Sequence, residues 1–184
     1  FDQNIMITEL TEHLMAKYNW PSIKNDATEY ISNYTNNNLF LNHEYISNNL
    51  EVSLEEIQKE CANFLLKYEW VKNTYTATQL HENEYSNSFH SLIQRGYNQK
   101  RSGDVIVSLQ TGWLKSYWEG GGTTHGSSYS YDTHVPLIFW GSKIPQGTTD
   151  RKVNIRDIAP TISTILGNSY PNGCTGNPLP EITE

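Results

Sequence analysis

The sequence predicts an α/β fold in which a small α+β unit precedes part of a larger α/β core. Two apolar runs, residues 105–107 and 135–140, are short and continuous, as in strands that are covered on both faces. Residues 157–166 have helical spacing and are followed by Gly167, a typical helix C-cap. Before residue 85 the pattern differs, because short amphipathic elements alternate with polar turns.

Residues 1–85 form the expected small α+β unit. Its predicted elements are a helix over residues 5–18, strands over 27–35 and 39–45, a helix from residue 54, and a strand over 70–74. The two strands flank the triplet Asn36-Asn37-Asn38, as in a β-hairpin. Ser53 and Glu56 have the spacing of a capping box, which begins the second helix. We expect an antiparallel sheet with both helices on one face.

Residues 86–184 form the expected core part. Its predicted elements are a helix over residues 87–96, strands over 104–110 and 135–140, and a helix over 157–166. A long loop over residues 111–125 separates the two strands. It contains a run of glycines and one histidine, His125. Loops at the ends of buried strands are where α/β enzymes place ligands, so His125 is the candidate functional residue.

Composition excludes some classes of function. The chain has 184 residues and a formal net charge of −7, and its basic residues are scattered, which argues against a nucleic-acid partner. No apolar run approaches the length of a transmembrane helix. The two cysteines, Cys61 and Cys174, leave a disulfide possible without indicating one.

The second part of the chain resembles the alkaline phosphatase superfamily. The resemblance is to its single-chain branch from Bacteroidetes-type bacteria, together with type I phosphodiesterases and nucleotide pyrophosphatases. The matching segments, in chain order, are Gly96-Tyr97-Asn98, Arg101-Ser102-Gly103-Asp104-Val105, His125-Gly126-Ser127, Tyr131-Asp132, Val135-Pro136-Leu137-Ile138-Phe139 with Gly141, Asp157 to Gly167, and Pro171-Asn172-Gly173-Cys174-Thr175-Gly176. Both the content and the order of these segments fit the family.

The resemblance implies a zinc-dependent phosphate-ester hydrolase with two zinc ions and a threonine or serine nucleophile. Most zinc ligands, and the nucleophile, belong to segments that this sequence does not contain. The last histidine ligand maps onto His125, and no catalytic residue maps onto the chain. The resemblance therefore implies a C-terminal fragment of an exported, periplasmic or secreted enzyme, inactive alone. Its partners would be a phosphate-ester substrate and the rest of the polypeptide, with residues 1–85 as a cap or insertion.

Two residues near the loop have subsidiary roles in this interpretation. Asp132 and His134 have the look of a ligand pair, but related hydrolases usually have a non-ligating residue at the position of His134. We interpret His134 as a structural residue that holds either the strand entry or a carboxylate. We interpret Asp132 as a carboxylate that orients the loop, behind His125.

Other interpretations remain open from the sequence. The chain could come from a sulfatase or phosphonate hydrolase relative, or residues 1–80 could form a non-catalytic binding module. The aromatics Trp113, Tyr117 and Trp118 beside the glycine-rich loop could contact a ligand, although packing is the simpler expectation. Residues 101–104 could be mistaken for a phosphate clamp, but their position at a strand start favours packing and turn formation.

Overall fold

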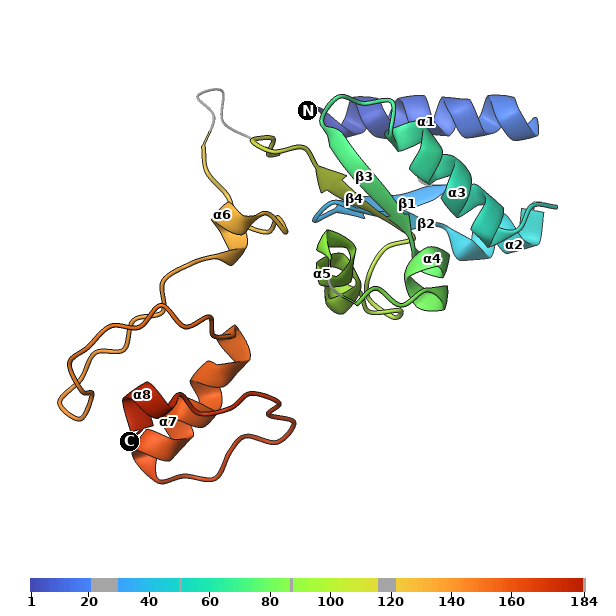
Figure 1. Cartoon of the computed structure of the whole chain (residues 1–184). Coiled ribbons are helices and arrows are strands. Elements are labelled where there is room, and N and C mark those ends of the chain that lie inside the picture. Colours follow the sequence, from blue (N-terminus) through green and yellow to red (C-terminus); the bar gives the residue numbers. More distant parts are fainter. Residues whose placement is uncertain (21–29, 50, 87, 116–121, 184) are drawn as a thin grey trace. The chain divides into compact units, whose positions relative to one another are not determined.

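The structure is a computed structural model that describes residues 1–20, 30–49, 51–86, 88–115 and 122–183. It contains two compact units, residues 1–134 and 135–184. Figure 1 shows the helices and strands of both units. The strand that follows residue 85 pairs with strands that precede it. The division into a cap of residues 1–85 and a core part of residues 86–184 concerns a longer protein and stays a prediction.

An antiparallel sheet of four strands forms the centre of the first unit, in the order β1-β2-β4-β3. The strands are β1 (Ile31–Thr35), β2 (Asn38–Leu41), β3 (Val71–Thr76) and β4 (Val105–Leu109). Asn36 and Asn37 turn the chain between β1 and β2 with φ values of 48° and 58°. Asparagine tolerates this left-handed conformation, which two-residue hairpin turns require. The predicted hairpin is confirmed, except that residues 27–29 lie outside the described residues.

The second strand of the hairpin ends earlier than the sequence predicts. Residues 43–45 belong to helix α2 (His43–Asn49), so the predicted strand over 39–45 is wrong in its last part. The side-chain oxygen of Asn42 accepts a hydrogen bond from the backbone N–H of Tyr45 at 3.0 Å. Such a bond satisfies a first-turn amide and begins a helix.

Two helices cover one face of the sheet, as expected. They are α1 (Gln3–Tyr18) and α3 (Leu54–Leu65), and Figure 1 shows them side by side above the strands. The Ser53 hydroxyl accepts a hydrogen bond from the backbone N–H of Glu56 at 3.2 Å, which confirms the predicted cap of α3. Side chains from both helices and all four strands form one core, which includes Leu10, Leu14, Ile57, Leu65, Leu39, Val71, Val105 and Val107. Cys61 is buried in this core as a free thiol, and Cys174 is also free.

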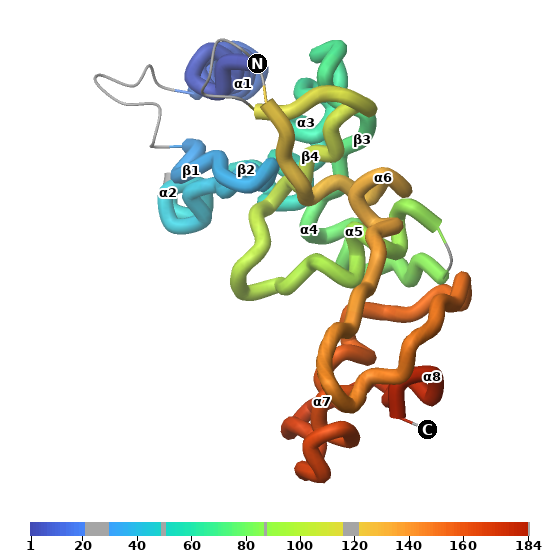
Figure 2. Tube along the Cα trace, turned by 90° about the vertical axis from the view of Figure 1, so that its left-hand side faces the viewer, coloured from blue at the N-terminus to red at the C-terminus, as the bar shows by residue number. Residues whose placement is uncertain are grey.

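The other face of the sheet carries α5 (Phe89–Gly96). The hydroxyl of Tyr75 on β3 lies 2.8 Å from Nδ1 of His90 on α5. Figure 2 shows α5 on the side of β4 opposite α1. The helix predicted over 87–96 is confirmed from Phe89, and residue 87 lies outside the described residues. A further short helix, α4 (Ala77–Glu82), was not predicted; Thr76 caps it by accepting from the backbone N–H of Gln79 at 3.0 Å.

The second unit is built around α7 (Ile158–Leu166), which a short 3-10 helix (Ile155–Asp157) precedes. A last helix, α8 (Pro180–Thr183), packs against α7. Gly167 ends α7 with a φ of 68°, a conformation that glycine adopts without steric cost. The predicted helix and its C-cap are confirmed. Nowhere in the described ranges is a helix long and apolar enough to cross a membrane.

The apolar run Val135–Trp140 is not a strand, which corrects the sequence prediction. Its side chains are exposed instead, except for the half-buried Phe139; Ile138 is 80% exposed and Trp140 96%. A strand exists only where a neighbour accepts and donates its backbone hydrogen bonds. None of the described residues pairs with this run in a sheet.

Asp157 joins α7 to the segment that follows it. One carboxylate oxygen accepts from the backbone N–H of Asn154 at 2.9 Å, and the other from that of Asn177 at 3.0 Å. The fully buried Thr161 hydroxyl donates to the Asp157 carbonyl and accepts from the backbone N–H of Leu179 at 3.0 Å. The backbone donors of Asn154 and Asn177 lower the pKa of Asp157, because they stabilise its charged form.

The lowered pKa of Asp157 predicts acid sensitivity in the second unit. A carboxyl with a depressed folded-state pKa stabilises the fold above its unfolded pKa, about 3.9, and this contribution is lost as the pH falls below that value. We expect NMR signals of folded α7 amides to weaken below about pH 4. Asp157→Asn should weaken them already at pH 7, whereas the exposed Asp150→Asn should behave as the parent. Identical pH profiles for Asp157→Asn and the parent would contradict this assignment.

Candidate functional site

His125 is exposed in the loop between β4 and α6 (Ser130–Thr133). It belongs to the second described part of this loop, which begins at residue 122. The loop forms one wall of a cavity of about 860 Å³, which we call the loop cavity. The other walls come from β4, the β1–β2 turn and α5. Of the stretch before the histidine, Gly121 lies outside the described residues.

Asp132 holds the loop at Ser127, two residues after His125. Its Oδ2 accepts a hydrogen bond from the backbone N–H of Ser127 at 2.9 Å. Hydrogen bonds from Ser127 lower the pKa of the Asp132 carboxyl, and the nearby imidazole of His125 adds to this effect. This contact is what a loop-orienting carboxylate requires; the further role of Asp132 towards a metal stays a prediction.

Tyr129 fastens the C-terminal end of the loop to the strand from which the loop departs. Its hydroxyl donates to the carbonyl oxygen of Leu109, the last residue of β4, at 3.0 Å. Its ring packs against Phe89 of α5 and stacks on Tyr131, with centroids 5.3 and 5.5 Å away. Nothing in the sequence marks Tyr129 for this role, because a tyrosine among loop residues carries no local signal of a contact 20 residues away.

His134 ends α6 and is exposed. Its backbone N–H donates to the carbonyl oxygen of Ser130 at 2.8 Å. Because the following run is not a strand here, the structure shows no strand entry for His134 to support. Its role as a structural residue stays a prediction.

Within the described ranges, no three His, Cys, Asp or Glu side chains gather closely enough to hold a metal ion. His125 could supply one imidazole ligand, because its ring is exposed and the loop around it is anchored at Ser127 and Tyr129. Asp132 is already engaged by Ser127. Of these two residues, His125 could supply one ligand to a metal ion, which is fewer than a complete site requires.

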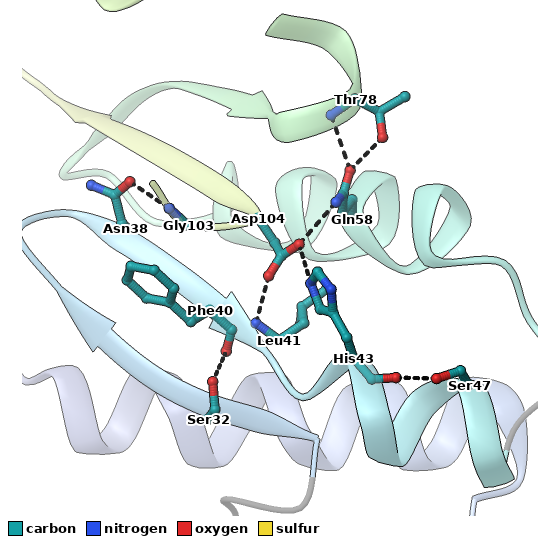
Figure 3. Close-up of polar contacts among 10 residues, drawn as sticks. All are labelled: Ser32, Asn38, Phe40, Leu41, His43, Ser47, Gln58, Thr78, Gly103 and Asp104. Carbon is teal, nitrogen blue, oxygen red and sulfur yellow. Dashed lines mark hydrogen bonds and ion pairs between the residues drawn. The ribbon is translucent and has the colours of Figure 1, made fainter. Parts of the chain in front are cut away.

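A second polar centre lies at the start of β4, around the buried Asp104 (Figure 3). One of its oxygens accepts from the backbone N–H of Leu41 at 2.8 Å. The other lies 2.7 Å from Nε2 of His43 and accepts from Nε2 of Gln58 at 3.0 Å. Gln58 in turn accepts from the backbone N–H and hydroxyl of Thr78. Asp104 thus joins β2 and β4 to α2, α3 and α4.

The neighbouring Gly103 explains why this segment is a packing element. Its N–H donates to the side-chain oxygen of Asn38 at 3.0 Å. A Cβ on Gly103 would lie 2.5 Å from the carbonyl oxygen of Leu39, closer than carbon and oxygen approach. Residues 101–104 therefore turn the chain and pack against β2, as the sequence favoured. Of the aromatic candidates, Trp113 lines the loop cavity, whereas Tyr117 and Trp118 lie outside the described residues.

The chain is similar to known alkaline phosphatases in sequence and in structure. The chain is 33% identical over 132 residues to alkaline phosphatase PafA of Elizabethkingia meningoseptica, which covers 72% of this chain and 24% of PafA. It is 30% identical over 127 residues to alkaline phosphatase PhoV of Synechococcus elongatus, covering 69% of this chain and 23% of PhoV. The crystal structure of wild-type PafA matches with a TM-score of 0.82 and 28% identity, over 97% of this chain and 33% of that one. The homologues of this chain therefore include alkaline phosphatases.

This homology to alkaline phosphatases confirms the family resemblance and the α/β fold class, since the mixed helices and strands match part of the PafA fold. All 184 residues also align, at 33% identity, with a Myroides odoratus protein named calcium-transporting ATPase, over 32% of its length. No family model matches the chain. The chain spans about a third or less of the length of these relatives.

Proposed function

We propose that this chain is the C-terminal part of a zinc-dependent phosphate-ester hydrolase, to which it contributes His125 as a metal ligand. The observation that carries the proposal is the similarity to PafA, which extends over nearly the whole chain in structure and most of it in sequence. The intact protein would be periplasmic or secreted, act on phosphate monoesters or diesters, and hold two zinc ions.

The residues of this chain would act by holding and presenting one ligand. Zinc at such a site would supply positive charge that activates an attacking oxygen and stabilises a leaving one. The His125 imidazole would bind through one ring nitrogen in its neutral form. Asp132 would keep the loop backbone in place through Ser127, so that the imidazole need not be ordered when the metal binds. The nucleophile and the other ligands would come from the rest of the polypeptide.

The exposed run Val135–Trp140 supports a longer polypeptide. Consecutive apolar side chains that face water are costly, and they are typical of a surface that another segment covers. We propose that another segment of the intact polypeptide covers this run. The cap of residues 1–85 and core part of residues 86–184 belong to the same proposal.

Metal dependence of the intact protein tests the proposed function. The intact protein should hydrolyse p-nitrophenyl phosphate, lose this activity on treatment with a chelator and regain it with added zinc. The 184-residue chain alone should show no hydrolysis above background, because it supplies one ligand and no nucleophile. Hydrolysis that persists in the metal-free intact protein would overturn the zinc dependence, and a zinc-loaded protein without any phosphatase activity would overturn the function.

A further inference from the structure

The loop cavity is lined by residues of β4, α5 and the β1–β2 turn as well as by the candidate ligand His125. Its volume of about 860 Å³ lies within the range of small-molecule sites. Tyr129 and Asp132 hold the loop wall in place through hydrogen bonds to Leu109 and Ser127. The cavity is therefore shaped by anchored elements of a single compact unit.

The lining of the cavity includes apolar and aromatic side chains. Leu92 and Ile93 come from α5, and Leu92 is 42% exposed. Ile106 comes from β4, where strand alternation directs it away from the core that contains Val105 and Val107. An exposed leucine beside a concave surface is what an apolar ligand group would cover.

Two aromatic rings with large exposed areas line the same cavity. Trp113 is 41% exposed and Tyr131 is 56% exposed, and both line the cavity together with His125. Exposed indole and phenol rings offer flat faces on which another ring can stack.

The charged side chains of the cavity already have partners. Lys115 donates to the side-chain oxygen of Gln3. The carboxylate of Asp132 accepts from the backbone N–H of Ser127. The asparagines of the β1–β2 turn, residues 36–38, add uncharged hydrogen-bonding groups to the lining. A lining of this kind favours an uncharged ring of a ligand over an ionised group.

We propose that the loop cavity binds the uncharged aromatic part of a phosphate ester, whose phosphate end faces His125. This inference rests on the proposed function for the phosphate end alone. The aromatic part, whether an aryl group or a nucleobase, is recognised by Trp113, Tyr131 and the apolar side chains of α5 and β4. Trp113 is thus a specificity-determining residue.

Binding of an uncharged ring can be tested on the 184-residue chain without any hydrolysis. Adenosine and phenol are titrated separately while the NMR methyl signals are followed, with ribose as the non-aromatic control. Both aromatic probes should shift the methyl signals of Leu92, Ile93 and Ile106 and leave those of Ile57 on the opposite face of the sheet unchanged. A response to adenosine alone would restrict the site to nucleobases, and a response to phenol alone to aryl groups. The absence of any shift with both probes would overturn the proposal.

Trp113→Ala should weaken binding of the responding probe at least about fivefold, because stacking on one aromatic ring contributes about 1–3 kcal/mol. Trp140→Ala, at an exposed tryptophan in the other compact unit, is the matched control and should leave the affinity unchanged. Tyr131→Leu provides a second variant in case Trp113→Ala misfolds, which circular dichroism would reveal. Unchanged affinity in a folded Trp113→Ala or Tyr131→Leu variant would overturn the role of these rings.

Hydrolysis by the intact protein tests whether the loop cavity selects phosphate esters that have an aromatic group. The ratio of kcat/KM for phenyl phosphate to that for ethyl phosphate should fall at least about fivefold in Trp113→Ala. An equal fall for both esters would overturn the specificity role, while the proposed function would stand. Methyl shifts without hydrolysis of either ester would overturn the proposed function and the phosphate orientation, but the aromatic site would stand.

Discussion

Replacement of His125 by alanine in the intact protein is expected to lower zinc content and to reduce kcat/KM for p-nitrophenyl phosphate at least about a hundredfold. A zinc site that loses one protein ligand binds the ion more weakly and leaves it poorly placed to stabilise charge. The imidazole is exposed and lies on a loop whose anchors are Ser127 and Tyr129, so its removal should leave the fold intact. Metal analysis of the purified variant and steady-state kinetics measure the two effects.

His81→Ala is the matched control for this experiment. His81 is an exposed histidine on α4, and it is absent from the residues that line the loop cavity. The kcat/KM of Asp132→Asn should lie between those of the two variants, up to about tenfold below the parent. This substitution weakens the Ser127 anchor of the loop but keeps the His125 ligand. If His125→Ala retains the zinc content and rate of the parent, His125 is no ligand.

Asp104→Ala is expected to lower the free energy of unfolding of the first unit by about 3–5 kcal/mol. The substitution removes the acceptor of the Leu41 amide and the acceptor of the Gln58 side chain, both of which are buried. Each buried donor left without a partner costs about 1–3 kcal/mol. Urea unfolding of the 184-residue chain measures the loss through the fluorescence of Trp20 and Trp70, which lie in the same core.

Glu55→Gln is the control for the loss of a carboxylate as such. Glu55 pairs with Lys59 on the exposed surface of α3, where an ion pair contributes little. We expect a change within about 0.5 kcal/mol for this variant. Asp104→Asn keeps the size of the side chain and one carbonyl oxygen, so its loss should be smaller than that of Asp104→Ala. Equal stabilities of Asp104→Ala and Glu55→Gln would show that the network around Asp104 does not support the fold.

Elements with signals inside their own sequence could be predicted. The helices α1, α3 and α7 have repeated apolar residues, and local residues such as Ser53 and Gly167 begin or end two of them. The asparagine triplet predicted the β1–β2 turn, because its residues tolerate positive φ. The family resemblance, too, depends on contiguous motifs, and the similarity to PafA and PhoV confirms it.

The candidate site could be predicted only in part, for the same reason. The glycine-rich loop marked His125, and the short spacing of Asp132 from the loop suggested that its carboxylate orients the backbone. The anchor at Tyr129 and the walls of the loop cavity depend on residues from β4 and α5 that the sequence places far from the histidine. Spacing along a chain does not show which of these distant side chains meet.

By itself, then, the sequence determined the helices α1, α3, α5 and α7, the hairpin turn and the family, because each depends on residues within a few positions or on one continuous motif. Only the tertiary structure decided that Asp104 joins segments up to 63 residues away. It also decided that Val135–Trp140 stays unpaired among the described residues, although its composition is that of a strand. Backbone hydrogen bonds in a sheet, and acceptors for buried donors, come from partners that local spacing does not specify.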